Sequence, residues 1–521
     1  MKSSRNEERR SRRRTNQFGM LPSASIMRRE AITAREAASE RSTRGPRKGL
    51  NMRRTSILLL ATSLLATEAQ AETLRQALER AYRTNPNLTG ARAGLRATDE
   101  GVPLAKAAAR PTASATADYQ EFVVRSANSF VSPFRAASAG ANVSLPLYQG
   151  GGVRSAIRAA DARVLAGRAS LRSTEADVFT AVVSAYMDVI RDDSIVGLNR
   201  ANVKVLETNL QASEDRFQVG DLTRTDVAQS EARLALARAQ LETAEAQLDA
   251  SRENYTRFVG VPPVDLQPPP PLPGLPGSID QAETIAIENN PTLLAAQAQA
   301  KATRYDIGVA KATRLPKLAL VGNSSYNNYL GTLGGNVPGR IFQQAQRTAT
   351  VGVSLSVPLY QGGAPGSRVR RAQALESQAL EQIVTVERGV IADARAAFSR
   401  YRATQGVIRS AEIAVKANDL ALEGTRAENT VGTRTVLEVL NAQQELLNSR
   451  VQLITAQRDA YVAAFALRAA MGRAEARDLG LGGTALFDPT LDYTRPRVRG
   501  IPAPSSLTGE PIPDGDVGAD R

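Results

Sequence analysis

The side chains available for chemistry in this 521-residue chain are carboxylates, hydroxyls, amides and cations, because the sequence contains no His and no Cys. Without Cys there is no thiolate nucleophile, no disulfide and no Cys-based metal site. Without His the usual general base and the commonest zinc ligand are missing too. We therefore expect a protein that is not an enzyme, with no catalytic residues, no metal and no cofactor.

Two short turns carry the most distinctive polar residues. Val219-Gly220 and Val431-Gly432 each interrupt a long stretch that favours helix. Gly permits the positive φ of a helix C-terminus, and a following Thr or Asp can cap the next helix. Each dipeptide therefore predicts at least a turn between two helices, and the residues that complete these turns are Leu222, Thr223 and Thr433.

Charged and amide side chains follow immediately after both turns. They are Arg224, Thr225 and Asp226 after the first turn, and Arg434, Glu438 and Asn441 after the second. Glu438 and Asn441 are three residues apart, so they share one face of a helix. In an oligomeric pore an inward carboxylate becomes a ring that attracts cations. The alternative is that these are ordinary solvated charges on a helix surface.

The formal net charge of +14 is concentrated near the N-terminus. Residues 1–71 hold 16 Lys and Arg against 6 Asp and Glu, which leaves the rest of the chain close to neutral. A nucleic-acid-binding protein is therefore not expected, since any polyanion site would rest on this segment alone.

Residues 52–71 have the pattern of a secretory signal peptide. Two arginines precede the apolar stretch Ile57–Ala66, and Ala69-Gln70-Ala71 forms an A-x-A cleavage site. We expect cleavage after Ala71. Residues 1–51 are predicted to be a non-native or disordered extension, and the alternative is a basic arm for nucleic acid.

The remainder of the chain contains an internal duplication, in which one unit occurs twice. Asn85-Pro86 returns as Asn290-Pro291, an offset of 205, while Tyr148-Gln-Gly-Gly returns as Tyr360-Gln-Gly-Gly, an offset of 212. We assign a first repeat to 72–260, a Pro-rich linker to 261–277, a second repeat to 278–472, and a C-terminal segment with a disordered tail to 473–521. The tail is expected to begin at Phe487, where Pro, Gly and Asp become frequent.

The hydrophobic period changes within each repeat. Segments 73–110 and 278–315 favour helix, whereas 137–147 and 349–359 alternate strictly between apolar and small polar residues. An alternation of 10–12 residues fits a tilted membrane-spanning strand, although a soluble sheet would show the same pattern. Segments 112–124 and 317–327 are the expected hairpin partners.

Very long helices are predicted after each Tyr-Gln-Gly. Segments 153–217 and 366–429 are rich in Ala, Leu, Glu, Arg and Gln and contain no proline, and second helices follow at about 221–259 and 433–471. Four strands are too few to close a membrane barrel, because single-chain barrels start at about eight strands. The chain must therefore pool its strands with copies of itself.

These motifs resemble the TolC family of outer-membrane channels over about residues 72–472. The resemblance rests on the two Asn-Pro segments, the two Pro-Leu-Tyr-Gln-Gly-Gly motifs and the two Val-Gly turns. It implies a mainly α fold with β: an internally duplicated outer-membrane factor whose homotrimer forms a twelve-stranded β-barrel continuous with a long periplasmic α-helical barrel. It also implies a passive exit duct for efflux or type I secretion in the outer membrane of a Gram-negative bacterium. The implied partners are membrane lipid, a periplasmic adaptor, and an inner-membrane pump or ABC transporter.

The resemblance assigns roles to the polar residues at the turns. Arg434 matches an arginine that reaches a Thr-Asp pair, here Thr225-Asp226, and so holds the periplasmic gate closed. Glu438 and Asn441 match two acidic rings at this gate, so the second ring lacks its charge here. A tyrosine that assists the lock is replaced by Asn429. The two departures, at Asn441 and Asn429, together predict weaker cation selectivity and a looser lock.

The turns themselves match the tips where adaptors dock. These tips comprise Val219, Gly220, Leu222, Thr223, Val431, Gly432 and Thr433. The competing interpretation of the chain is a structural periplasmic coiled coil or an adaptor, which would have no paired alternating strands.

Overall fold

The computed structural model describes residues 72–124, 132–334, 339, 341–481 and 486–488. The chain divides into two units, Met1–Thr67 and Glu68–Arg521, and the first lies outside the described residues. The expected extension, the signal peptide with Ala69 and Ala71, and residues 489–521 also lie outside them. Among the described helices, none is both long enough and apolar enough to cross a membrane.

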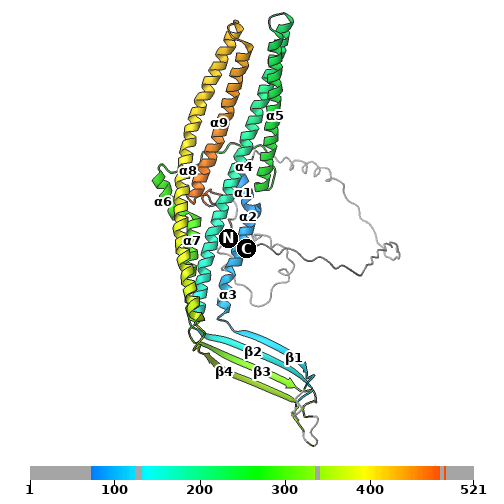
Figure 1. The fold of residues 1–521 in the computed structure, drawn as a ribbon, viewed down its shortest axis with the longest axis vertical. Coiled ribbons are helices and arrows are strands. Elements are labelled where there is room, and N and C mark those ends of the chain that lie inside the picture. Colours follow the sequence, from blue (N-terminus) through cyan, green and yellow to red (C-terminus); the bar gives the residue numbers. More distant parts are fainter. Residues whose placement is uncertain (1–71, 125–131, 335–338, 340, 482–485, 489–521) are drawn as a thin grey trace, which may run out of the picture. The chain divides into compact units, whose positions relative to one another are not determined.

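The first repeat runs from short helices through a hairpin into a long helical pair (Figure 1). Its elements are α1 (Leu74–Thr84), α2 (Pro86–Asp99), α3 (Gly101–Ala107), β1 (Thr112–Glu121), β2 (Arg135–Gln149), α4 (Gly152–Gln218) and α5 (Arg224–Val259).

The second repeat follows the same order. Its elements are α6 (Ile279–Asn289), α7 (Pro291–Ala312), β3 (Lys317–Asn328), β4 (Ala345–Ser356), α8 (Ala364–Thr430) and α9 (Val436–Ala470). Helices α4 and α8 are each 67 residues long, and α5 and α9 have 36 and 35 residues. The internal duplication and the mainly α fold with β are thus confirmed.

The four strands form one antiparallel sheet in the order β1-β2-β3-β4. The central pair joins the two repeats, with Val143 opposite Gly322. A register shift between Pro146 and Tyr148 accommodates a proline that cannot donate to the ladder.

The end of β4 differs from the sequence expectation. The alternating segment was expected to extend to Leu359, but β4 ends at Ser356, so Val357 and Leu359 lie outside the strand. The partner strand explains the difference, because β3 begins at Lys317 opposite Ser356, so Val357 and Leu359 have no β3 residue opposite them.

The sheet has little hydrophobic core of its own. Every residue of β1 is exposed, and β4 is exposed at all positions but its first. Its apolar side chains are included, since Val351 is 82% and Leu355 63% exposed. A soluble protein rarely leaves such a patch uncovered.

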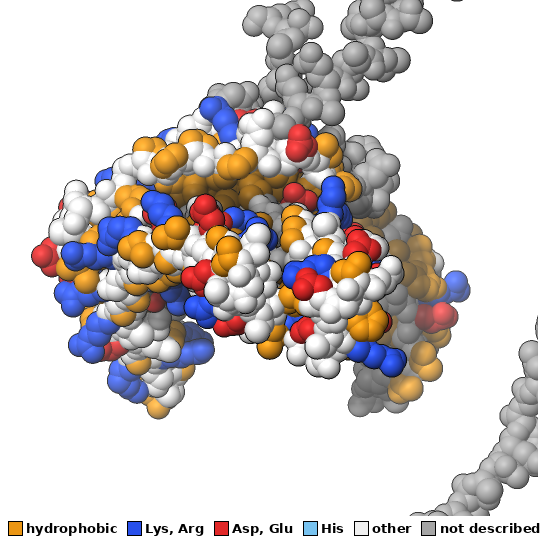
Figure 2. Space-filling model, turned by 90° about the horizontal axis from the view of Figure 1, so that it is seen from above, with side chains coloured by type: hydrophobic (Ala, Val, Ile, Leu, Met, Phe, Trp, Pro, Cys, Tyr) orange, Lys and Arg blue, Asp and Glu red, His pale blue; other side chains and the backbone are white. Residues whose placement is uncertain are grey.

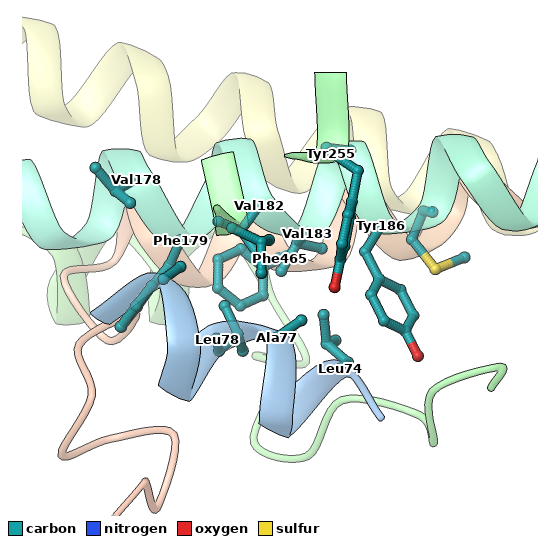
Figure 3. Close-up of a cluster of buried hydrophobic side chains, with 14 of the residues drawn as sticks. Leu74, Ala77, Leu78, Val178, Phe179, Val182, Val183, Tyr186, Tyr255 and Phe465 are labelled. Carbon is teal, nitrogen blue, oxygen red and sulfur yellow. The ribbon is translucent and has the colours of Figure 1, made fainter. Parts of the chain in front are cut away.

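The largest core cluster lies where α1 packs against the long helices (Figure 3). Phe179 and Tyr186 of α4, Tyr255 of α5 and Phe465 of α9 meet Leu78 of α1 there. The Tyr186 hydroxyl donates to the carbonyl of Gln267 (2.6 Å), which ties the Pro-rich linker to this core.

The C-terminal segment also reaches this core. Phe487, where the tail was expected to begin, packs against the cluster, and its backbone N–H donates to the Tyr82 hydroxyl (2.9 Å). The start of the expected tail at Phe487 is therefore corrected, because an apolar ring at this position has a core surface to cover.

The two Asn-Pro motifs have the same structural role. Asn85 and Asn290 each cap the next helix through the side-chain oxygen, and each side-chain amide donates to a carbonyl at the end of the repeat's last helix. These acceptors are Phe258 (2.9 Å) and Ala470 (3.0 Å). One side chain thus breaks the leading helical segment and fixes it to the end of α5 or α9.

Candidate gate and docking tips

The two tips share one backbone geometry. Gly220 and Gly432 have φ values of +84° and +81°, which a residue with a side chain adopts only at a cost. Their N–H groups donate to the carbonyls of Phe217 and Asn429, both at 3.0 Å. Both turns are therefore the glycine-ended helix termini that the sequence predicts.

Apolar side chains project at both tips. Val219 is 80% and Val431 75% exposed, and a Cβ on Gly220 or Gly432 would meet nothing within 4 Å. Leu222 is partly buried, whereas Thr223 and Thr433 are exposed. Seen from above, hydrophobic side chains are interspersed with charges of both signs (Figure 2).

The helices that leave the tips begin with capping boxes of the same pattern, a Thr at the N-cap and an acidic residue three positions later. The hydroxyl of Thr223 accepts from the N–H of Asp226, whose carboxylate accepts from the Thr223 N–H at 3.0 Å. Thr435 and Glu438 repeat this exchange at 3.3 and 2.8 Å. Asp226 and Glu438 are thus equivalent positions, separated by the repeat offset, and α5 and α9 start later than the sequence suggests because a Thr cap precedes each.

The caps keep both carboxylates ionised. Hydrogen bonds from the Thr223 side chain and backbone lower the pKa of Asp226. The backbone N–H of Thr435, followed by the Arg434 guanidinium, lowers the pKa of Glu438 to about 2. At the tips both groups therefore carry a full negative charge at neutral pH.

Arg434 is held between two carboxylates of its own repeat. It lies 2.7 Å from Glu428 and 2.7 Å from Glu438, and these partners raise its pKa. Asn429 donates to the Arg434 carbonyl at 2.7 Å. Within the described part of this single chain, Arg434 makes no hydrogen bond or ion pair with Thr225 or Asp226.

Asn441 links the two repeats. The guanidinium of Arg233 on α5 donates to its side-chain oxygen at 2.6 Å. Below this contact Leu234 and Leu440 pack with Val203 and Leu206. Neither Arg233 nor Glu428 was predicted from the sequence as part of this site. The repeat counterpart of Glu428 is Arg216, which pairs with Asp221 at 2.7 Å.

No metal-binding group is evident in the parts of the chain that the structure describes, where no three His, Cys, Asp or Glu side chains cluster suitably. The tips offer exposed apolar contacts, capped carboxylates and one doubly paired arginine, which suit recognition and electrostatic control.

Comparison with known proteins defines the class. The model of the family "Outer membrane efflux protein" matches residues 74–261 and 284–473, and the chain belongs to this family. The two matched segments follow the internal duplication.

Particular relatives agree with this assignment. The chain is 33% identical to the outer membrane efflux protein BepC of Brucella suis over 438 residues, which cover 84% of this chain and 93% of that protein. It is 27% identical to the outer membrane protein TolC of Vibrio cholerae, over 80% of this chain and 95% of the relative.

Solved structures share the fold. CusC gives a TM-score of 0.66 at 16% identity, covering 77% of this chain and 92% of its own. VceC of Vibrio cholerae gives a TM-score of 0.64 at 22% sequence identity, and the match covers 77% of this chain and 96% of VceC.

The TolC-family resemblance is thus confirmed. The chain is an outer-membrane channel protein for efflux or secretion that extends into the periplasm. The alternative of a structural coiled coil or an adaptor is not favoured, because family membership covers both repeats and the strand hairpins within them.

Proposed function

We propose that the chain acts as a homotrimeric, passive exit duct of a tripartite efflux or type I secretion system. A periplasmic adaptor and an inner-membrane pump or ABC transporter would dock on its tips. The observation that carries this proposal is a four-stranded sheet with edges at β1 and β4, followed by helices of 67 residues.

The strand count supports a trimer. Backbone N–H and C=O groups on the outer edges of β1 and β4 find no partner within the described chain, and hydrocarbon would not tolerate them. Three copies supply twelve strands, and β4 of one protomer would pair with β1 of the next.

The gate would rest on competition for Arg434. In the closed trimer Arg434 would contact Thr225 and Asp226 of the first repeat, where Asp226 is ionised. In the single chain the same guanidinium is held by Glu428 and Glu438. These local partners favour its release from Asp226, so the gate would open more readily than with an unpaired arginine.

The rings below the lock would be unequal. Glu438 is ionised and supplies three negative charges in a trimer, which would attract cations. Asn441 supplies none, and its oxygen is already occupied by Arg233. We therefore expect weak cation selectivity at the gate.

The exposed valines of the tips support adaptor docking. Val219 and Val431 project apolar surface beside capped helix ends, in the two positions that the repeat makes equivalent. The tip residues Gly220, Leu222, Thr223, Gly432 and Thr433 would shape the same contact.

Conductance in planar bilayers tests the lock. Arg434→Ser or Asp226→Ala should raise the open fraction of the purified trimer by about tenfold, since a charge-assisted hydrogen bond contributes about 1.5–3 kcal/mol. Arg216→Ser is the matched control, because Arg216 forms an equally exposed ion pair at the other tip. An unchanged closed-state current in both lock variants would reject the assignment.

A further inference from the structure

The four junctions between helices and strands lie together. The Gln149 side chain donates to the carbonyl of Ala108 at 3.1 Å, which joins the first junction to the second. A Cβ on Gly150 would lie 2.7 Å from that of Leu315, so the second and third are in close contact. Arg314 donates to the carbonyl of Pro365 at 3.5 Å and joins the third to the fourth.

These junctions form a strongly basic collar, which we define as residues 106–110, 150–160, 308–317 and 361–371. The collar contains no Asp and no Glu. Its cations are all exposed and, within the described residues, none forms a salt bridge: Lys106, Arg110, Arg154, Arg158, Lys311, Arg314, Lys317, Arg368, Arg370 and Arg371. Elsewhere on the helices arginines are frequently paired, as Arg163 is with Asp306 just beyond the collar.

The duplication places cations at matching positions of the collar. Lys106 and Lys311 are related by the offset of 205, and Arg158 and Arg370 by the offset of 212. Both repeats therefore contribute positive charge at the same level of the molecule, next to the strand ends.

Apolar and aromatic side chains lie on the strand side of the collar. Leu147 and Tyr148 are 53% and 49% exposed, and their repeat counterparts Leu359 and Tyr360 are 94% and 90% exposed. Along the chain the order is exposed apolar strand, tyrosine, then arginine. This is the order that proteins present to a bilayer as it passes from hydrocarbon through the interface to charged headgroups.

We propose that the collar binds the headgroups of anionic phospholipids in the leaflet that faces the helical body. The ten exposed cations attract anionic groups, and the adjoining tyrosines and leucines place those groups at headgroup depth. The inference rests on the sheet lying in the outer membrane, but it is independent of the gate and of any adaptor.

The test is the thermal stability of the purified trimer in neutral detergent with added lipid. Phosphatidylglycerol should raise the dissociation temperature by about 2–4 °C more than phosphatidylcholine. About 0.5 M NaCl should remove this difference by screening. Inorganic phosphate without acyl chains should produce no rise.

A variant with four substitutions in the collar tests whether the lipid preference arises there. Lys106→Gln, Arg158→Gln, Lys311→Gln and Arg370→Gln together should abolish the preference for phosphatidylglycerol, while the temperature in phosphatidylcholine stays unchanged. The matched control neutralises four exposed arginines farther along α8, namely Arg388, Arg402, Arg409 and Arg426, and should keep the preference.

Several results would overturn the proposal. These are equal shifts with both lipids, a phosphatidylglycerol shift that survives high salt, an equal shift with inorganic phosphate, or a collar variant that keeps the full preference. If the collar variant does not assemble, the lipid and salt comparisons on the unaltered chain decide. A trimer with normal gating and no lipid preference would reject this inference and leave the proposed duct intact.

Discussion

The two repeats are alike at the Asn-Pro motifs and different at the tips. Asn85 and Asn290 make the same cap and the same contact to a helix end. At the tips the backbone and caps are shared, but Arg216 pairs with Asp221 in the first repeat, whereas Glu428 pairs with Arg434 in the second. The sign of the charge is reversed at positions 216 and 428.

This difference separates the residues that the fold requires from the residues that we propose for the gate. The leading helical segment breaks in both repeats and needs an N-cap at the break, so an Asn occupies this position in each repeat. Arg434 corresponds to Leu222 in the first repeat, and Asp226 to Glu438. Each repeat therefore keeps its carboxylate, but only the second has an arginine before its capping Thr, which makes an asymmetric contact between unlike tips possible.

The prediction with the larger expected effect concerns the Asn-Pro motifs that both repeats share. Asn85→Ala should lower the free energy of unfolding by about 2 kcal/mol, because it removes an N-cap and leaves the carbonyl of Phe258 without this donor. Asn290→Ala should cost a similar amount. Denaturant unfolding monitored by helical circular dichroism measures both.

Asn87→Ala is the control for these variants, since Asn87 is exposed on the same helix and should cost little. If Asn85→Ala lowers the free energy of unfolding strongly and Asn290→Ala does not, the two motifs are not equivalent.

The smaller prediction concerns the tips and their pH dependence. The pKa of Glu438 is lowered from 4.5 to about 2, so the contribution of its cap is complete above the ordinary pKa and is lost as the pH falls through the folded value. Arg434→Ser should raise this pKa only in part, because the Thr435 N–H is the largest cause. The same change should leave the pKa of Asp226 unaltered, since Thr223 alone lowers it.

Carboxyl ¹³C titration of selectively labelled protein distinguishes the two residues. If Arg434→Ser shifts Asp226 as much as Glu438 in a dispersed single chain, the tips are coupled within one protomer, contrary to the contacts described.

The sequence predicted the elements better than the contacts. Long proline-free stretches rich in Ala and Leu, Thr caps and Val-Gly turns are local signals, and α4, α5, α8 and α9 follow them closely. The end of β4 was missed because the alternation continues through Val357-Pro358, whereas the hydrogen-bond ladder does not.

The partners of the candidate gate residues depend on packing across the chain. Arg233 and Asn441 are 208 residues apart, and no local pattern joins them. Phe487 was assigned to the tail because its neighbours are Pro, Gly and Asp, yet the surface that it covers is formed by Tyr82 and Arg92. Long-range contacts of this kind are set by the assembled helices rather than by composition.

Strands of neighbouring protomers are expected to pair, and the duplication predicts their register. Within the chain Val143 of β2 lies opposite Gly322 of β3. The hairpin registers Thr112↔Ser144 and Lys317↔Ser356 relate β1 to β3 by 205 residues and β2 to β4 by 212. The same pairing between neighbours therefore places Leu355 of one protomer opposite Ala117 of the next.

Disulfide crosslinking in outer-membrane fractions tests this most directly, because the chain has no Cys of its own. Opposed antiparallel residues have Cα atoms about 4.5–5.5 Å apart, within reach of a disulfide. Ala117→Cys with Leu355→Cys should yield a covalent trimer on oxidation, whereas Ala117→Cys with Ser354→Cys, on opposite faces, should not. A double variant at Ala117 and Leu355 that stays monomeric in a correctly inserted protein would contradict the account.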